Sequence, residues 1–143
     1  MKPVVQLDRT GCGIACVAAL AGVTYPQAKR AANRLGISVD DNRLWSGTQD
    51  VRRLLKHFRL SAASGETPFV SWQGLPDVAL IAIKWHREKG CPSWHWVVFW
   101  RSPQGPVVLD SKCALRRPVR TDFGRMKPKW WIGVERETHR RSR

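Results

Sequence analysis

The chain has 143 residues, and its 25 Lys plus Arg against 11 Asp plus Glu give a formal net charge of +14. This length suits one domain with a hydrophobic core and leaves no room for two of ordinary size. A hydrophobic content of 43% argues against disorder, and four cysteines are too few for a disulfide scaffold. With no CxxC pair and no zinc-finger spacing in the sequence, we expect no metal or other cofactor. Such cysteine usage favours a reducing, cytoplasmic setting.

An uncharged stretch, residues 11–28, follows a short basic leader and could be taken for a secretion signal. The leader also contains the acidic Asp8, however, and Gly13 and Gly22 interrupt the apolar run. The run is well short of the ~20 apolar residues that a membrane span needs. We therefore expect a buried core helix here.

Three helices are predicted in the first 60 residues. Gly22 and Gly36 stand where the first two should stop, and Pro26 lies near the start of the second. Thr48 is the expected N-cap of the third helix. The predicted ranges are Cys12–Ala21, Tyr25–Leu35 and Gln49–Phe58.

The later part of the chain contains short runs rich in Val, Ile and Trp, which are separated by Gly and Pro. These runs predict strands, and residues 102–106 predict a hairpin turn between the second and third. We expect an α+β domain over residues 1–137, with the helices packed on an antiparallel sheet, and a basic tail over 138–143. The predicted strands are Val78–Trp85, Trp94–Arg101, Val107–Asp110 and Trp130–Glu135.

Cys12 has the sequence context of a reactive thiol. It opens the most apolar predicted helix and lies between two glycines, so little side-chain bulk blocks access to it. The positive end of a helix lowers the pKa of a thiol, and the thiolate is the nucleophile. Cys16, one turn further on, would lie inside the helix and is predicted to be a packing residue.

The segment from Gln6 to Cys16, QLDRTGCGIAC, resembles the N-terminal motif of the bacteriocin-processing, double-glycine leader peptidases, a papain-like cysteine peptidase family. The resemblance implies that Cys12 is the nucleophile and that Gln6, six residues earlier, helps to form the oxyanion hole. Gly11 is a departure, because an acidic residue commonly precedes the nucleophile in the family.

The resemblance continues in the predicted sheet. The segment Ser93–Phe99, SWHWVVF, is similar to the family's histidine strand, and Val107–Asp110 is similar to the strand that ends in its aspartate. This implies that His95 is the base and that Asp110 orients it, as in a catalytic triad. Ser111 stands where the family usually has proline. The similarity runs from about residue 4 to 111 and does not cover 112–143.

The other three histidines compete poorly with His95 for the role of the base. His86 is the reserve candidate, and regular strand alternation would point it away from Ile81, Ile83 and Trp85. On the next strand, alternation places Trp94, Trp96 and Trp100 on the face opposite His95, Val97 and Phe99. The remaining histidines are His57, in a basic helix, and His139, in the tail.

The leading hypothesis is a cysteine peptidase whose substrate is a peptide or protein, cut by resemblance after Gly-Gly or other small residues. Two alternatives remain open: an idle papain-like module that binds nucleic acid or an acidic protein, and a Cys-dependent deamidase or amidase. The charge of the C-terminal part of the chain is relevant to possible binding partners. Residues 116–143 carry ten basic and three acidic side chains, a net charge of +7. Such a field attracts acidic substrates, nucleic acid or anionic lipid without choosing among them. Oligomeric state is open.

Overall fold

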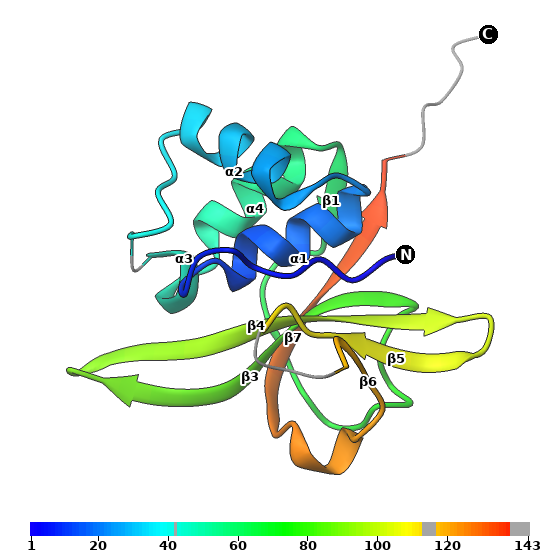
Figure 1. Cartoon of the computed structure of the whole chain (residues 1–143). Helices are drawn as coiled ribbons and strands as arrows, with labels where there is room; N and C mark the ends of the chain where they lie inside the picture. The colour runs from blue at the N-terminus through cyan, green and yellow to red at the C-terminus, as the bar shows by residue number, and fades with distance from the viewer. Residues whose placement is uncertain (42, 113–116, 138–143) are drawn as a thin grey trace, which may run out of the picture.

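Helix α1 (Cys12–Ala21) lies at the centre of the fold, and nine of its ten residues are buried. The structure is a computed structural model that describes residues 1–41, 43–112 and 117–137 (Figure 1). The helix ends where predicted, at Gly22, whose φ of 72° is the left-handed conformation that glycine adopts readily. The uncharged stretch therefore forms a core helix. Among the described residues, no helix is long and apolar enough to cross a membrane.

The remaining helices pack around α1. They are α2 (Tyr25–Arg34), α3 (Arg43–Ser46) and α4 (Gln49–His57). Both α2 and α4 end one residue before the predicted position, and the four-residue α3 was not predicted. Thr48 precedes α4 as expected but makes no cap hydrogen bond, and its hydroxyl donates to Glu66 at 2.7 Å instead. Thr48 is thus the N-cap residue, as predicted, but its side chain does not supply the capping hydrogen bond.

The described strands form one antiparallel sheet in the order β1-β7-β3-β4-β5-β6, with β2 paired to β7. The last of the described strands, β7, thus lies inside the sheet between β1 and β3. The four predicted strands fall on β3, β4, β5 and β7. The bounds are β1 (Leu60–Ala62), β2 (Thr67–Pro68), β3 (Val78–Glu88), β4 (Cys91–Ser102), β5 (Gly105–Leu109), β6 (Val119–Arg120) and β7 (Pro128–Arg136).

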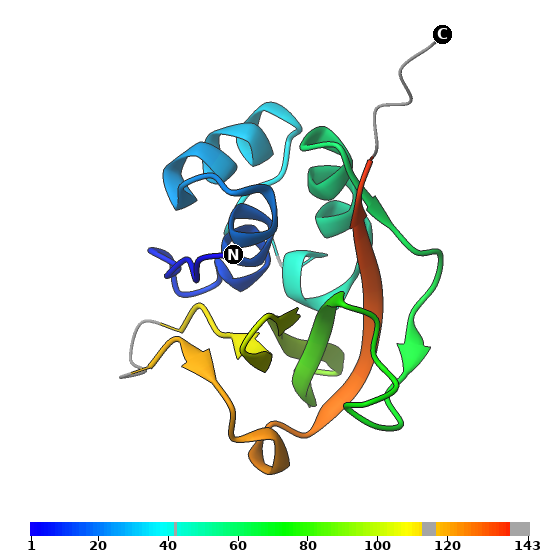
Figure 2. The same ribbon diagram turned by 90° about the vertical axis from the view of Figure 1, so that its right-hand side faces the viewer.

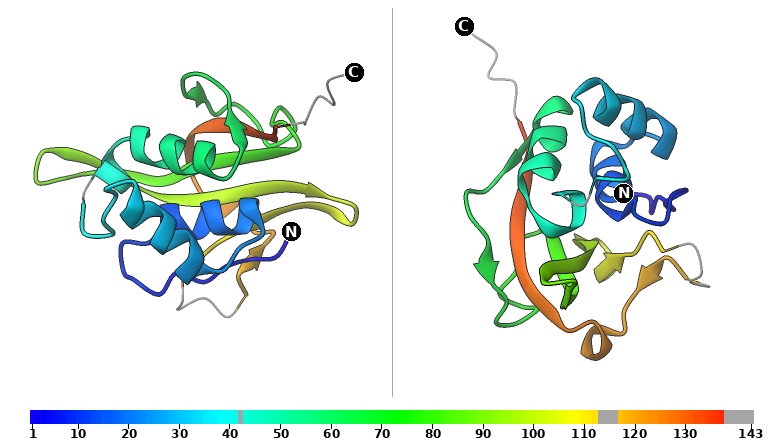
Figure 3. Two further views of the ribbon diagram at one scale, coloured as in Figure 1. Left: turned by 90° about the horizontal axis from the view of Figure 1, so that it is seen from above. Right: turned by 90° about the vertical axis from the view of Figure 1, so that its left-hand side faces the viewer.

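The helices cover one face of the sheet, as the views from the side and from above show (Figures 2 and 3). Alternation along β4 divides its side chains between two cores, as predicted. Trp94 and Trp96 pack toward the helices, whereas Val97 and Phe99 belong to a second core on the other face. This second core is closed by Leu75, Trp72, Met126 and the 3₁₀ turn Phe123–Arg125.

Trp85 lies on the face opposite to the one predicted. Ile81 and Ile83 belong to the second core, but Trp85 packs against the helical core. The pairing of β3 with β4 shifts register between Ile83 and His86, and Lys84 has a φ of 53°. A bulge adds one residue to the strand, which reverses the alternation that follows it. The regular spacing used for the prediction gives no sign of this bulge.

Candidate active site

The Cys12 thiol lies at the N-terminal end of α1, where the helix presents unpaired backbone N–H groups. The chain enters the helix through a tight loop in which the Gly11 N–H donates to the Asp8 carbonyl at 3.1 Å. The structure therefore gives Cys12 the helix-end position expected from the sequence.

The space beside Gly11 is filled by Tyr25 from α2. A Cβ atom built on Gly11 would lie 2.0 Å from the Tyr25 hydroxyl oxygen. That hydroxyl donates to Asp8 Oδ2 at 2.6 Å, and Lys29 Nζ lies 3.0 Å from the same carboxylate oxygen. The hydrogen bonds from Tyr25 and Lys29 hold the pKa of Asp8 below its usual value. A side chain at position 11 would therefore collide with Tyr25 as it is placed here.

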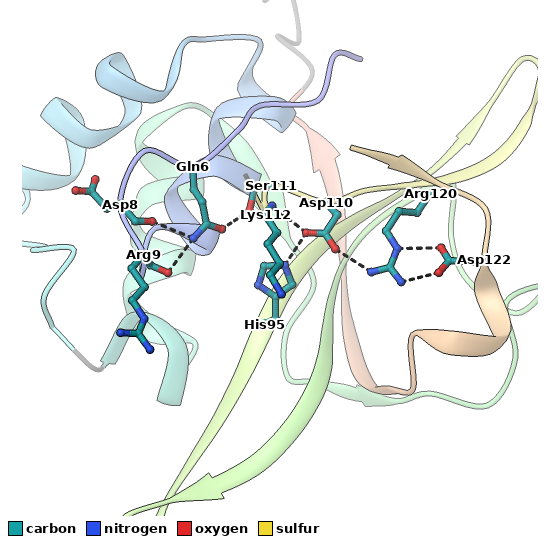
Figure 4. Close-up of polar contacts among 9 residues, drawn as sticks. All are labelled: Gln6, Asp8, Arg9, His95, Asp110, Ser111, Lys112, Arg120 and Asp122. Carbon is teal, nitrogen blue, oxygen red and sulfur yellow. Dashed lines mark hydrogen bonds and ion pairs between the residues drawn. The ribbon is translucent and has the colours of Figure 1, made fainter. Parts of the chain in front are cut away.

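His95 and Asp110 meet across the end of the β4–β5 hairpin (Figure 4). The last registered pair of that hairpin is Val98 with Leu109, so Asp110 follows the strand and reaches His95 diagonally. The His95 Nε2–H donates to Asp110 Oδ1 at 2.7 Å. The Cys12 thiol lies beside His95 at the same cavity and interacts electrostatically with the imidazole. Since Asp110 occupies Nε2, the Nδ1 atom is the one left for the thiol.

Two of these side chains, those of Cys12 and His95, border a small cavity of about 360 Å³. Cys12 and His95 line it together, so segments 83 residues apart in the sequence meet at one concave surface. The rest of the lining is mostly polar and comes from the loop before α1 and from the projecting β3–β4 arm: Arg9, Thr10, Glu88, Ser93 and Trp94.

The His95–Asp110 pair has strongly shifted proton affinities. Burial lowers the pKa of His95, but the hydrogen bonds with Asp110 and Cys12 outweigh it and raise that pKa to about 9. Burial raises the pKa of Asp110, but the hydrogen bond from His95, together with those from the Lys112 backbone and Arg120, lowers it to about 2. The carboxylate is thus ionised at neutral pH and favours a protonated imidazole beside it.

The competing side chains lie in other environments. Cys16 is buried, and this burial raises the pKa of its thiol well above the usual value. The reserve candidate His86 is exposed; its Nδ1 contacts the Lys84 carbonyl, and its Nε2 lies 3.8 Å from Glu88. His57 stacks edge-on against Phe58, and His139 lies outside the described residues. The structure does not bring any of the described alternatives together with Cys12 in the cavity.

Gln6 is buried beside the loop that precedes Cys12. Its Nε2 donates to the carbonyls of Asp8 and Arg9, both at 2.9 Å, and its Oε1 accepts from the Ser111 hydroxyl at 2.8 Å. The Gln6 backbone N–H donates to the Ser111 carbonyl at 2.9 Å. Gln6 therefore ties the loop before Cys12 to Ser111, the residue after Asp110.

Arg120 is the residue of this site that the sequence analysis did not identify. It lies on β6 beside β5, and its Nη1 donates to Asp110 Oδ2 at 2.9 Å. In the sequence, its charge is one of ten basic side chains over residues 116–143 and does not stand out from them. The available signal was the Arg120-Thr-Asp122 triplet, whose two-residue spacing places opposite charges on one face of an extended segment.

A larger cavity of about 650 Å³ lies elsewhere, between the N-terminal residues, the C-terminal half of α1 and the far ends of β4 and β7. Its lining is mostly apolar and contains no Cys or His, so it offers no nucleophile or base. Within the part of the chain that the structure describes, no cluster of three or more His, Cys, Asp or Glu side chains could hold a metal ion.

The described residues form an α+β arrangement, helices on one face of an antiparallel sheet, that is compatible with a papain-like fold. The structure is similar to the crystal structure of the peptidase domain of Streptococcus ComA, a bi-functional ABC transporter involved in a quorum sensing pathway. The TM-score is 0.56 at 17% sequence identity, over 95% of this chain and 98% of that chain. No protein-family model and no curated protein matches the chain. The likeness shows a shared fold.

Proposed function

We propose that this protein is a cysteine peptidase with Cys12 as nucleophile, His95 as base and Asp110 as the residue that orients His95. The observation that carries the proposal is the meeting of the three groups: a thiol at a helix N-terminus and a histidine from the sheet line one cavity, and behind the histidine a buried carboxylate accepts its hydrogen bond. The similarity of the fold to that of a peptidase domain supports the proposal. A fold alone does not establish activity, so the side-chain geometry is the stronger support.

In the proposed reaction, Cys12 and His95 start as a thiolate–imidazolium pair, the thiol proton being held by His95, and the thiolate attacks the carbonyl carbon of the scissile peptide bond. His95 then donates that proton to the leaving amine as the C–N bond breaks, which leaves an acyl-thioester on Cys12. A water molecule, deprotonated by His95, attacks the thioester and releases the acid product and the free thiol. Asp110 stays ionised throughout and stabilises the imidazolium.

The negative charge on the attacked oxygen needs hydrogen-bond donors. The Cys12 backbone N–H is suitable, because the first N–H groups of a helix have no intrahelical acceptor. Gln6 is proposed as the second donor, as the family resemblance implies. Both of its amide hydrogens bond to the carbonyls of Asp8 and Arg9, so one must be shared with the oxyanion or released when substrate binds.

The proposed substrate is a peptide or protein cut after small residues, with Gly-Gly as the first sequence to test. This preference comes from the resemblance, and the small size of the cavity, about 360 Å³, is consistent with it. The net charge of +14 favours a substrate with an acidic surface through long-range attraction.

The proposal predicts a thiol that is reactive in mild acid. Iodoacetamide at pH 6 should label Cys12 at least ~10-fold faster than an ordinary thiol of pKa ~8.5. His95→Ala and Asp110→Asn should each remove most of this excess, because the imidazolium that stabilises the thiolate is lost or weakened. Labelled positions are read by peptide mass spectrometry, and Cys91→Ser removes an exposed competing thiol. Labelling of Cys12 at the ordinary rate contradicts the proposal and favours an idle binding module.

Reaction type is tested with a cell lysate incubated with the wild-type protein or with Cys12→Ala. New peptide termini that require Cys12 identify a peptidase and give the cut site. Asn or Gln residues deamidated without new termini would instead identify the deamidase alternative, which uses the same groups.

A further inference from the structure

The Asp110 carboxylate is buried and receives hydrogen bonds at both oxygen atoms. Oδ1 accepts from His95 Nε2 at 2.7 Å and from the Lys112 backbone N–H at 3.0 Å. Oδ2 accepts from Arg120 Nη1 at 2.9 Å. Asp110 is 1% exposed, so these contacts rather than water balance its charge. One buried anion is therefore shared between the imidazole and a permanent cation.

Arg120 is itself shared between two carboxylates (Figure 4). Its Nε and Nη2 atoms donate to the two oxygens of Asp122 at 2.9 and 2.8 Å, which is a bidentate contact, while Nη1 is directed at Asp110. The Arg120 side chain is 13% exposed, and the Asp122 side chain is 42% exposed. The contacts form one chain of alternating groups: His95, Asp110, Arg120 and Asp122.

We propose that Arg120 is a positioning residue that weakens the hold of Asp110 on the His95 proton, and that Asp122 sets how strongly Arg120 does so. The inference rests on the proposed function, because it takes His95 as the base. A base works best when its proton affinity is close to the working pH, since it must both accept and return the proton. A buried carboxylate balanced by the imidazolium alone would hold that proton too firmly.

The sign of each effect follows from the charges. Arg120→Gln removes a positive charge from Asp110, so the imidazolium of His95 is stabilised more strongly and its pKa rises. Asp122→Asn removes a negative charge from the far side of Arg120, so the guanidinium acts more strongly on Asp110 and the pKa of His95 falls. The Lys112 N–H still holds Oδ1 toward His95 in both variants. A purely structural role for Arg120 predicts no such opposite pair of shifts.

Other charged or titratable groups also face this pair. Cys12 of α1 contacts His95, and Cys16 of α1 interacts with Asp110. Arg9 from the N-terminal loop and Glu88 from β3 line the cavity beside His95. These residues are retained in every variant compared below, except that Cys12 is replaced by Ala in all of them, so that the thiol does not take part in the titration.

The test is an NMR titration of the His95 ring protons in the Cys12→Ala protein, with the resonance assigned by its loss in His95→Ala. We expect Arg120→Gln to raise the pKa of His95 by about half to one unit, which is a three- to tenfold gain in proton affinity. Asp122→Asn should lower it by a similar amount. Arg120→Lys, which keeps the charge, should stay close to the parent. Arg136→Gln removes an exposed positive charge remote from the pair and should cause no shift.

Shifts of the same sign in Arg120→Gln and Asp122→Asn, or no shift in either, would overturn the inference. Asp122→Asn keeps the test decisive if Arg120→Gln does not fold, because a rise or no change in that variant contradicts the expected fall. The titration needs neither substrate nor thiol. A failure of the peptidase proposal in the alkylation experiment is therefore distinguishable from a failure of this inference.

Discussion

Gly11 is a residue whose missing side chain shapes the approach to the candidate nucleophile. Tyr25 occupies the position that a Cβ atom would take, and its hydroxyl is held there by Asp8. A side chain at position 11 would therefore push against an aromatic ring that has a fixed hydrogen-bond partner. The loop before Cys12 keeps its shape partly because nothing is present at this position.

We predict that Gly11→Ala lowers the free energy of unfolding by about 1–3 kcal/mol, the usual cost of overpacking a buried position. Urea denaturation measures the change. Gly124→Ala is the control, because a Cβ atom there would meet no other atom within 4 Å and should change stability little. Equal stabilities for the two variants would show that Tyr25 moves aside without cost.

Single residues of the site differ in how far the sequence could predict them. Cys12, His95 and Asp110 stand in motifs with characteristic neighbours, so their order along the chain indicated the site before the fold was considered. Arg120 and Ser111 have no such motif. Their importance arises from contacts with Asp110 and Gln6, which lie 10 and 105 residues away in the chain. No local pattern records a contact of this kind.

At the scale of elements, the β3–β4 hairpin is the most distinctive part of the sheet, and it projects beyond the other strands (Figure 1). Glu88 pairs with Cys91, so Lys89 and Gly90 form a two-residue loop with φ values of 51° and 80°. Positive φ at both loop residues is the requirement of a type I′ turn, for which Asn-Gly is the preferred sequence. Lysine is a poor residue for its position.

We predict that Lys89→Asn raises the free energy of unfolding by about 0.5 kcal/mol, because asparagine tolerates the left-handed conformation better than lysine. Lys89→Ala is the matched control: it removes the same charge but keeps the penalty for a side chain with positive φ, so it should give no gain. Thermal unfolding of the three proteins measures the difference. A gain of equal size in both variants would point to relief of charge repulsion instead.

The helices and strands also differ in how well sequence patterns predict them. Helices α1, α2 and α4 were predicted to within a residue because apolar spacing and glycine stops are local signals. Strands β1, β2 and β6 have two or three residues each, which is too short for alternation to be visible. The bulge at Lys84 was not predicted either, because it depends on how β3 pairs with its neighbours.

At the scale of the whole molecule, the buried His95–Asp110 pair couples stability to pH. The pKa of His95 is raised from 6.5 to about 9, so its stabilising contribution is complete below pH 6.5 and is lost as the pH rises through 9. The pKa of Asp110 is lowered from 3.8 to about 2, so its contribution is present above pH 3.8 and is lost as the pH falls toward 2. The two pKa shifts describe the same His95–Asp110 interaction, so its contribution to the free energy of unfolding is counted once.

We therefore predict a stability maximum between about pH 4 and 6.5, with a loss on the order of 1–3 kcal/mol from this pair on either side. Urea unfolding at a series of pH values measures the profile. In His95→Ala the decline between pH 6.5 and 9 should be absent, since the group that titrates there is gone. A decline of the same size in that variant would assign it to other groups.

The sequence by itself determined helices α1, α2 and α4, the main strands and the candidate triad residues, because these depend on apolar periodicity, turn residues and motifs that are local in the chain. Only the tertiary structure decided the central position of β7, the reversed face of Trp85, and the contacts of Arg120 with Asp110 and Asp122. These depend on strand pairing and on charges brought together by folding. The pairing of segments that are distant in the chain depends on their arrangement in space, and local sequence patterns do not reveal that arrangement.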